Sequence, residues 1–394
     1  MIRSNIPKLR FKEFTDEWQG KKLGDIGCII TGKTPSTSDH MLWDGDLPFV
    51  TPTDINNEDK YQKNTERHVL EKQKNILPTG AILYTCIASI GKMSILNKPS
   101  ISNQQINSLI VASGYNNEFV YYYLLKETPK IQAIQANTTL PIINKSEFSK
   151  IKIRIPQKQE QQKIAEFLGA VDDKIKKLEE KKKGFEKYKK GMMQAIFSQK
   201  IRFKKPNDSN YPDWEKKKLG EIGKITTGKT PSTFKKELWK GDILFVTPTD
   251  IIEGKKYQNN TNRKVCNNLD NILPEGSILF TCIASIGKMS LSVNPCITNQ
   301  QINALMVNEE FSNEFVYYAL LNKTPKIKST QANITLPIIN KTEFSKIEID
   351  VPPIGEQEKI AEFLTSLDDE IDLINKQLEQ AKLFKKSLLQ QMFV

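Results

Sequence analysis

The sequence has little of the chemistry on which enzymes and metal sites depend. It contains two histidines and five cysteines in 394 residues. The cysteines form no Cys-x-x-Cys pair and no Cys/His spacing typical of a metal site. No Gly-x-Ser-x-Gly, His-Glu-x-x-His or paired-acid motif is present, nor a Gly-x-Gly-x-x-Gly loop. We therefore predict a non-catalytic protein that binds no metal and no cofactor of its own.

Long apolar runs are absent as well. No stretch approaches the roughly 20 apolar residues that a membrane span needs, and the first residues, MIRSNIPKLRFKEF, do not resemble a signal peptide. We therefore expect a cytoplasmic location. Lysine and arginine number 58 against 46 acids, which gives a formal net charge of +12. This excess favours a polyanionic partner, nucleic acid first, over a basic surface that serves only solubility.

An internal repeat organises the chain. A shift of 196 residues aligns Trp18–Ser198 with Trp214–Val394 without a gap, with 103 identities in 181 positions, about 57%. A repeat of this length corresponds to a domain with an attached segment, and it is much longer than the repeat of a solenoid protein. Only two cysteines, Cys86 and Cys282, occupy matching positions, and we predict that both are buried free thiols. The two histidines, His40 and His68, align with Lys236 and Lys264 of the second copy, so neither histidine is a shared feature of the repeat.

Each copy changes character near its end. Up to about Ile155 and Val351, short β-branched runs broken by Gly, Pro and Asn predict mixed α/β domains, with one clear helix at 117–126. The segments that follow carry apolar heptads, so each predicts a long helix of about 33 residues, roughly 50 Å. The predicted class is α+β. Its parts are two mixed domains at 1–155 and 201–351, and two spacer helices at 156–200 and 352–394.

The heptads predict that the two helices pair with each other. Residues 157–198 carry 11 Lys and 7 acids, whereas residues 353–394 carry 5 Lys and 8 acids. Opposite net charges on two seams of equal length favour an antiparallel coiled coil between the copies over self-pairing. Such pairing would relate the two domains by an approximate twofold axis. Gly184 and Gly191 weaken the first helix and predict a local irregularity there. The predicted seams are Ile164, Leu168, Val171, Ile175, Leu178, Lys182, Phe185, Lys189, Met192 and Ile196, and Ile360, Leu364, Leu367, Ile371, Ile374, Leu378, Ala381, Lys385, Leu388 and Met392.

The segment GCIITGKTPST has the spacing of a phosphate-binding P-loop, with Gly27 five residues before Gly32-Lys33-Thr34. The intervening residues favour an extended backbone in both copies, and a proline follows at once. A P-loop ATPase is therefore a weak alternative. The stronger interpretation is an exposed loop that leaves a strand and offers lysine charge and hydroxyls to phosphates or a DNA groove.

Polar residues repeated in both copies are the candidate DNA-contacting residues. Asn and Gln can bond adenine with two hydrogen bonds in the major groove, whereas Lys, Ser and Thr suit phosphates. For any single residue, the capping of a turn or a buried backbone group is an equally good explanation. The candidates are Lys33, Thr34, Ser36, Thr37, Ser89, Lys92, Asn103, Gln104, Gln105, Asn107 and Asn137, with Lys229, Thr230, Ser232, Thr233, Ser285, Lys288, Asn299, Gln300, Gln301, Asn303 and Asn333.

The ordered set of motifs resembles the specificity subunits of type I restriction–modification systems, and the likeness spans essentially the whole chain. One departure is Gln157, where the second copy keeps the proline usual in the family, Pro353. The motifs that carry the resemblance are TGKTPS (31–36, 227–232), ASIGK (88–92, 284–288), NQQ (103–105, 299–301) and the spacer starts IPQKQEQQKIAEFL (155–168) and VPPIGEQEKIAEFL (351–364).

The resemblance implies a DNA-binding subunit without catalysis. Its two target-recognition domains would each contact half of a split site in double-stranded DNA. The paired helices would set the spacing and dock two methyltransferase subunits, which bind S-adenosylmethionine, and two restriction subunits that use ATP and Mg²⁺ can join. Because 81 of 128 positions match between 18–145 and 214–341, we expect nearly identical half-sites arranged as an interrupted inverted repeat. A protein-interaction scaffold with duplicated binding domains is the alternative from another class.

Overall fold

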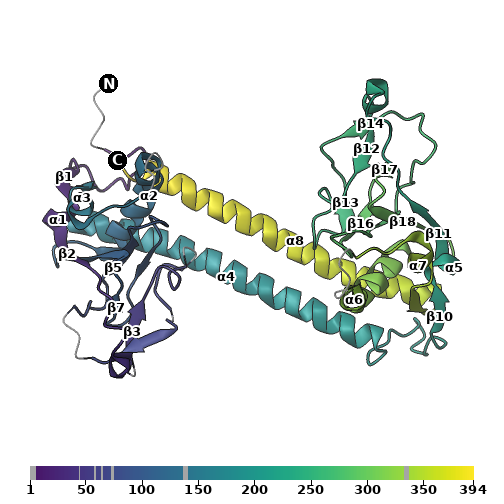
Figure 1. Cartoon of the computed structure of the whole chain (residues 1–394), viewed down its shortest axis with the longest axis horizontal. Helices are drawn as coiled ribbons and strands as arrows, with labels where there is room; N and C mark the ends of the chain where they lie inside the picture. Colours follow the sequence, from purple (N-terminus) through teal and green to yellow (C-terminus); the bar gives the residue numbers. More distant parts are fainter. Residues whose placement is uncertain are drawn as a thin grey trace. The chain divides into compact units, whose positions relative to one another are not determined.

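The computed structural model describes residues 6–43, 45–56, 59–63, 65–71, 75–135, 141–331 and 337–394. They form two compact units (Figure 1): unit 1 is Met1–Glu179 with Gln377–Val394, and unit 2 is Glu180–Lys376. The boundaries fall inside the two longest helices, α4 (Lys158–Phe197) and α8 (Ile354–Gln391), so each unit contains part of both. The predicted α+β class is confirmed. No helix among the described residues is long and apolar enough to cross a membrane.

Unit 1 is built on a four-stranded antiparallel sheet in the order β2-β8-β5-β6. The sheet consists of β2 (Gly27–Thr31), β8 (Ile106–Val111), β5 (Ile82–Thr85) and β6 (Met93–Ile95). A smaller sheet contains β4 (Arg67–Val69), β3 (Leu47–Val50) and β7 (Ile101–Ser102), and a ribbon pairs β1 (Gln19–Lys22) with β9 (Lys152–Ile155). The helices are α1 (Leu23–Ile26), the 3-10 turn η1 (His40–Trp43), α2 (Asn117–Gln135) and α3 (Lys145–Ser149).

Unit 2 repeats this arrangement with one additional short strand. Its large sheet has the order β11-β18-β15-β16-β13, and its small sheet has the order β14-β12-β17. The strands are β11 (Gly223–Thr227), β18 (Ile302–Val307), β15 (Ile278–Thr281), β16 (Met289–Ser292), β13 (Tyr257–Gln258), β14 (Lys264–Val265), β12 (Ile243–Val246), β17 (Cys296–Thr298), β10 (Glu215–Lys218) and β19 (Glu348–Val351). The helices are α5 (Leu219–Ile222), η2 (Lys236–Trp239), α6 (Asn313–Gln331) and α7 (Lys341–Ser345).

The core of unit 1 lies between the large sheet and helix α2. Strand β5, with the sequence ILYT, is buried at every position, as its continuous apolar run predicts for a central strand. Its Tyr84 packs against Phe148 of α3 with ring centroids 5.0 Å apart. From α2, Phe119 and Tyr122 enter the same core. The apolar stripe at 117–126 therefore forms the helix that covers the sheet.

The two long helices run antiparallel to each other within each unit. No position of the two predicted seams is exposed, so the heptad prediction is confirmed. Higher residue numbers in α4 pair with lower numbers in α8, which defines the antiparallel direction. Oppositely charged side chains bridge the helices, as Asp172–Lys385 at 2.6 Å and Glu179–Lys382 at 2.7 Å in unit 1, and as Lys181–Glu370 at 2.7 Å and Lys189–Asp368 in unit 2.

Helix α4 passes through Gly184 and Gly191 without interruption, so the predicted irregularity is wrong. A Cβ atom added at either glycine would meet nothing within 4 Å. Gly184→Ala and Gly191→Ala are therefore each expected to stabilise unit 2 by about 1 kcal/mol, because alanine restricts the unfolded chain more than glycine does. Thermal unfolding should shift upward by roughly 2–4 °C for each change.

Gly32→Ala is the matched control with the opposite sign. A Cβ at Gly32 would lie 2.2 Å from the carbonyl oxygen of Asn103, a contact that the backbone must move to relieve. A lower unfolding temperature for either helix variant would contradict the expectation for α4.

Candidate nucleic-acid interface

Three loops meet at one edge of the large sheet in unit 1. Thr31 at the end of β2 pairs with Asn107 near the start of β8, and Thr85 at the end of β5 pairs with Ile106. Neighbouring strands alternate in direction, so the segments that follow β2 and β5 and precede β8 leave the sheet on the same side. We call residues 32–37, 86–92 and 103–105 the loop edge of unit 1. The loop edge of unit 2 is residues 228–233, 282–288 and 299–301.

The Gly-Lys-Thr segment in this edge is not a P-loop. The residues between its two glycines form strand β2, which pairs antiparallel with β8, instead of a loop that could surround a phosphate. Gly32 lies so close to the carbonyl groups of Ser102 and Asn103 that a Cβ would clash with both. Glycine is therefore needed where one loop packs on another. The predicted exposed loop after a strand is confirmed, and Lys33 is exposed on it.

The Asn-Gln-Gln motif forms a turn that leaves its middle residue exposed. Asn103 accepts a hydrogen bond from the backbone N–H of Gln105 through Oδ1 (3.1 Å) and donates to Gln105 Oε1 through Nδ2 (3.0 Å). Gln104 is exposed, and the hydroxyl of Thr34 donates to its Oε1 at 2.7 Å. Unit 2 makes the same contacts, with Thr230 and Gln300 2.8 Å apart. This hydrogen bond orients the glutamine amide and leaves its NH₂ group available for an acceptor on DNA.

The Ala-Ser-Ile-Gly-Lys loop has an unusual backbone in both units. Ala88 and Ala284 have φ values of 62° and 61°, in the left-handed region that alanine rarely adopts. The backbone N–H of Cys86 donates to the Gln105 carbonyl at 2.8 Å, which holds this loop beside the Asn-Gln-Gln turn. Ser89 is exposed next to the strained alanine. Strain repeated in an exposed loop is typical of a functional segment.

The candidate residues of the sequence separate into groups by exposure. Those exposed on the loop edges are Lys33, Ser36, Thr37, Ser89, Gln104, Lys229, Ser232, Thr233 and Gln300. Those half-buried are Thr34, Lys92, Gln105, Thr230, Ser285, Lys288 and Gln301. One of these, Lys92, donates through Nζ to the carbonyl oxygen of Pro52 at 3.1 Å. Asn137 and Asn333 lie outside the described residues.

Four of the candidate asparagines have internal roles. Asn107 is 1% exposed; its Oδ1 accepts from the Thr31 hydroxyl at 2.7 Å, and its Nδ2 donates to the Ile143 carbonyl at 2.9 Å. Asn303 has the same two contacts and is fully buried. Asn103 and Asn299 are buried and shape their turns. Asn107 and Asn303 are therefore too buried to contact a duplex, and the amides of Asn103 and Asn299 are occupied by hydrogen bonds within their own turns.

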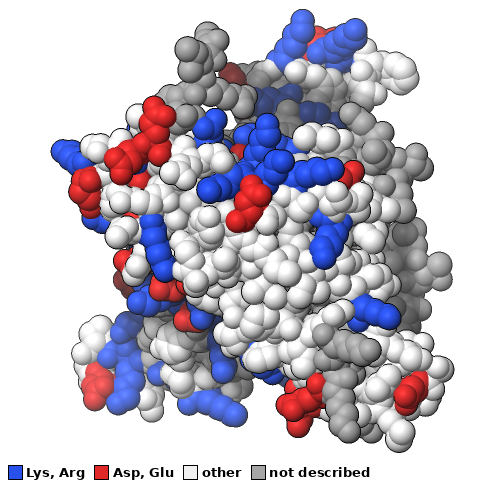
Figure 2. Space-filling model, turned by 90° about the vertical axis from the view of Figure 1, so that its left-hand side faces the viewer, with Lys and Arg blue, Asp and Glu red and all other residues white. Residues whose placement is uncertain are grey.

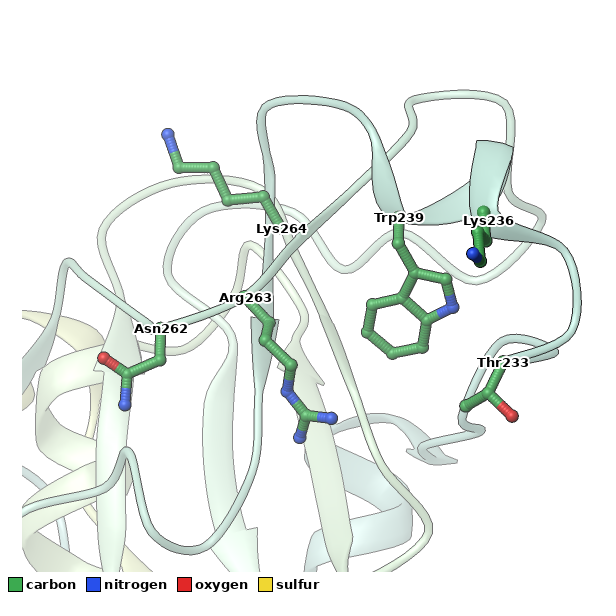
Figure 3. Close-up of a pocket in the computed structure, with 6 residues that line it drawn as sticks. All are labelled: Thr233, Lys236, Trp239, Asn262, Arg263 and Lys264. Atoms are coloured by element: carbon green, nitrogen blue, oxygen red, sulfur yellow. The ribbon is translucent and has the colours of Figure 1, made fainter.

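A cluster of one arginine and two aromatic side chains adjoins each loop edge, and the sequence analysis did not predict it. The Arg263 guanidinium lies 5.5 Å from the centre of the Trp239 ring and 5.0 Å from that of Phe245. The Trp239 Nε1–H donates to the Ser232 carbonyl at 3.1 Å, which joins the cluster to the loop edge. We call residues 233–239 and 262–264 the tip of unit 2 (Figure 3) and residues 37–43 and 66–68 the tip of unit 1. The tryptophans and arginines match in both copies of the sequence, but nothing there indicates that they stack on each other.

The tip of unit 1 has the same framework. The Arg67 guanidinium lies 5.6 Å from the Trp43 ring centre and 5.1 Å from that of Phe49. The Trp43 Nε1–H donates to the Ser36 carbonyl at 3.0 Å. Both units therefore position an arginine in the same way next to the Gly-Lys-Thr loop.

Charge is unevenly distributed over unit 1. Figure 2 shows one face of the molecule, on which Lys and Arg side chains gather in the upper part and in the lower left, while a broad central area is uncharged. Acidic side chains interrupt the basic ones on this face. The basic side chains on this face are not continuous, whereas the loop edges offer exposed lysines, Lys33 and Lys229, as electrostatic contacts for DNA.

The cysteines shared by the two copies are unreactive thiols. Cys86 and Cys282 are buried free thiols, as predicted. Burial raises the pKa of each thiol to about 11, so both remain protonated at neutral pH. Within the described ranges, no group of three or more His, Cys, Asp or Glu side chains is arranged to hold a metal ion.

Comparison with known proteins points to one family. Its model, described as "Type I restriction modification DNA specificity domain", matches residues 15–185 and again 211–383. The specificity subunit of the type I restriction enzyme MjaIX of Methanocaldococcus jannaschii is 27% identical over 95% of this chain and 92% of its own length. The HindI specificity subunit of Haemophilus influenzae is 35% identical over 36% of this chain and 32% of its own.

Solved structures share the fold. The S subunit of a type I restriction–modification system from M. genitalium has a TM-score of 0.64 at 18% identity and covers 99% of both chains. A structure reported for complex assembly and conformational transition of a type I system has a TM-score of 0.61 at 16% identity, covering 95% of this chain and 97% of its own.

Proposed function

This chain belongs to the family of type I restriction–modification specificity subunits, and we propose that its two DNA-recognition domains each read one half of a bipartite site in double-stranded DNA. Specificity subunits are non-catalytic components of these systems. The observation that carries the proposal is the loop edge, which presents the same exposed glutamine, lysine and hydroxyl groups in both units. A protein-interaction scaffold would not need this repeated set of groups suited to bases and phosphates.

The exposed residues divide by the part of DNA that their chemistry suits. Lys33 and Lys229 would contact phosphates, together with the serine and threonine hydroxyls of the same loops. Gln104 and Gln300 would contact base edges, with adenine as the best match because an amide can accept from N6 and donate to N7. The hydrogen bonds from Thr34 and Thr230 support this role, since a preoriented amide loses less entropy on binding.

The partners follow from the family. We propose that α4 and α8 set the separation of the half-sites and dock two methyltransferase subunits, which hold S-adenosylmethionine. Two restriction subunits that use ATP and Mg²⁺ would complete the assembly in the cytoplasm. One of the similar solved structures concerns complex assembly in a type I system, which supports partners of this kind. A gel shift with DNA, with and without the methyltransferase subunit, separates this function from that of a scaffold that binds no DNA.

The similarity of the two copies has a consequence for the site. The copies match at 81 of 128 positions between 18–145 and 214–341, and the exposed residues at matching positions of the loop edges are the same. The antiparallel heptads lead us to expect an approximate twofold axis between the two readers, and identical readers related in this way would contact the same bases on opposite strands. We therefore propose that the site is an interrupted inverted repeat with identical or nearly identical half-sites.

Mapping of methylated bases in a genome modified by the complex tests this proposal. Methylation is expected at one motif and its inverted copy, separated by a spacer of unspecified sequence. Two unrelated half-site sequences would overturn the inverted repeat while leaving the DNA-binding function in place.

A further inference from the structure

The two tips have formal charges of opposite sign although they share one framework. Both keep the framework of arginine, tryptophan and phenylalanine. Around it, unit 2 has Lys236, Asn262 and Lys264 where unit 1 has histidine, glutamate and histidine, at 40, 66 and 68. Unit 2 also has lysine at 235 where unit 1 has aspartate at 39. With four basic residues and one acid, the tip of unit 2 has a formal charge of +3, whereas the tip of unit 1, with one basic residue, two acids and neutral histidines, has −1.

Three basic residues of the tip of unit 2 are among those that line an open pocket of about 460 Å³. Its lining is Thr233, Lys236, Trp239, Asn262, Arg263 and Lys264, none of which is acidic. In Figure 3, Trp239 lies between the arginine on one side and the lysine and threonine of the preceding segment on the other. Because Arg263 already stacks on two aromatic rings, it loses little side-chain entropy when it binds an anion. This combination suits a phosphate group.

An exposed aromatic side chain points to a partner at the same place. Phe234 is 96% exposed, and it is followed directly by two lysines in the sequence. The matching residue in unit 1 is Ser38, so the shared framework does not need an aromatic ring here. A ring exposed next to basic groups can pack on a sugar or a base at the rim of a groove.

We propose that the tip of unit 2 is an additional binding surface for DNA backbone phosphate, and that the tip of unit 1 lacks this activity at neutral pH. The Trp239–Ser232 hydrogen bond places the tip next to the loop edge, so the phosphate lies beside the bases that Gln300 contacts. The complex then reads the same bases at both half-sites but holds the DNA more strongly through unit 2. This inference rests on the proposed function, because it assumes that the loop edges face a duplex.

Exchange of the tip residues tests the inference in the assembled complex with its methyltransferase subunits. One variant combines Lys236→His, Asn262→Glu and Lys264→His, which gives unit 2 the residues of unit 1 at these three positions. Its affinity for a DNA that contains the site is expected to fall by about 10- to 100-fold at low salt. The slope of log affinity against log salt concentration should decrease by about 2, since two lysines no longer displace counterions.

The reciprocal variant is the matched control. His40→Lys, Glu66→Asn and His68→Lys in unit 1 should strengthen binding and increase the slope by a similar amount. All six residues are on the surface of their units, at most half-buried, and the arginine–tryptophan framework stays intact, so both variants should fold like the original chain. Neither variant should change which sequence is methylated.

The outcomes separate the two levels of the proposal. If the original complex binds its site but neither exchange alters affinity or salt dependence, the tip does not contact DNA and the inference fails. A unit 2 variant that loses methyltransferase subunits but keeps the salt slope would assign the tip to a protein partner and also overturn it. If the original complex binds no DNA, the proposed function itself fails.

Discussion

Glu160→Ala is expected to destabilise unit 1 by about 3–5 kcal/mol. The Glu160 carboxylate is completely buried at the start of α4. Its two oxygens accept hydrogen bonds from Nε and Nη2 of Arg10, both at 2.8 Å, and Trp18 Nε1 donates to one of them at 3.3 Å. Hydrogen bonding with Glu160 also raises the pKa of the Arg10 guanidinium. Removal of the carboxylate would therefore leave a permanent positive charge almost buried and unpaired.

Chemical denaturation of single variants measures the loss. Glu166→Ala on the same helix is the matched control, because Glu166 is exposed and its change should stay within about 0.5 kcal/mol. The double variant Arg10→Ala with Glu160→Ala should recover part of the loss, since it removes both charges. Equal stability of the Glu160→Ala and Glu166→Ala variants would show that the ion pair contributes nothing to unit 1.

Unit 2 contains the same ion pair, but its arginine is one that the direct shift of the sequence does not align with Arg10. There Arg202 donates to the buried Glu356 at 2.8 Å through Nη2, and Trp214 Nε1 donates at 3.3 Å. Arg202 precedes its tryptophan by 12 residues, whereas Arg10 precedes Trp18 by 8. The extra four residues stopped the ungapped comparison at the tryptophans. A repeated Arg-Phe-Lys tripeptide, at 10–12 and 202–204, is the signal that could have extended it.

The long helices were predictable because a heptad is a local pattern with a direct physical meaning. Each apolar position recurs at the spacing that brings it to the same side of a helix, and the structure buries or half-buries all of them. The role of the Glu-Gln pair at the start of each helix could not be predicted from the sequence and is seen only in the structure. Gln161 accepts from the backbone N–H of Asn116 at 2.9 Å and so fixes α4 to the start of α2, 45 residues earlier in the chain. The periodicity of one segment gives no information about a hydrogen bond to a distant part of the chain.

The amides of the Asn-Gln-Gln-Ile-Asn motif show how far the sequence could predict the candidate site. In the sequence the four amides are chemically equivalent, and all were candidates for base contact. The turn before β8 decides between them, because it directs Gln104 outward while Asn103 and Asn107 bond to backbone and neighbouring side chains. The tips were missed for a related reason. A tryptophan and an arginine 24 residues apart carry no signal until folding stacks one on the other.

Gln104→Ala is expected to change which DNA is accepted more than how strongly DNA is held. Loss of one contact to a base pair typically removes about 1–3 kcal/mol of discrimination, roughly 5- to 150-fold. Lys33→Ala on the neighbouring loop is the matched control. This variant should bind specific and random DNA more weakly to the same degree, and its slope of log affinity against log salt concentration should decrease by about 1. The reason is that it loses a phosphate contact, which carries no sequence information.

The proposed inverted repeat allows a more specific prediction for the Gln104→Ala variant. The complex can bind a symmetric site in either orientation, so the unit with Gln104→Ala can always be placed over a damaged half-site. This variant should therefore tolerate a changed adenine–thymine pair in one half-site but not in both, whereas the variant with Gln104→Ala and Gln300→Ala should tolerate both changes. Competition methylation with the original site, the two singly changed sites and the doubly changed site measures this directly. If the single variant rejects a single change as strongly as the original chain does, the exposed glutamines do not read bases, and another group on the loop edge must account for specificity.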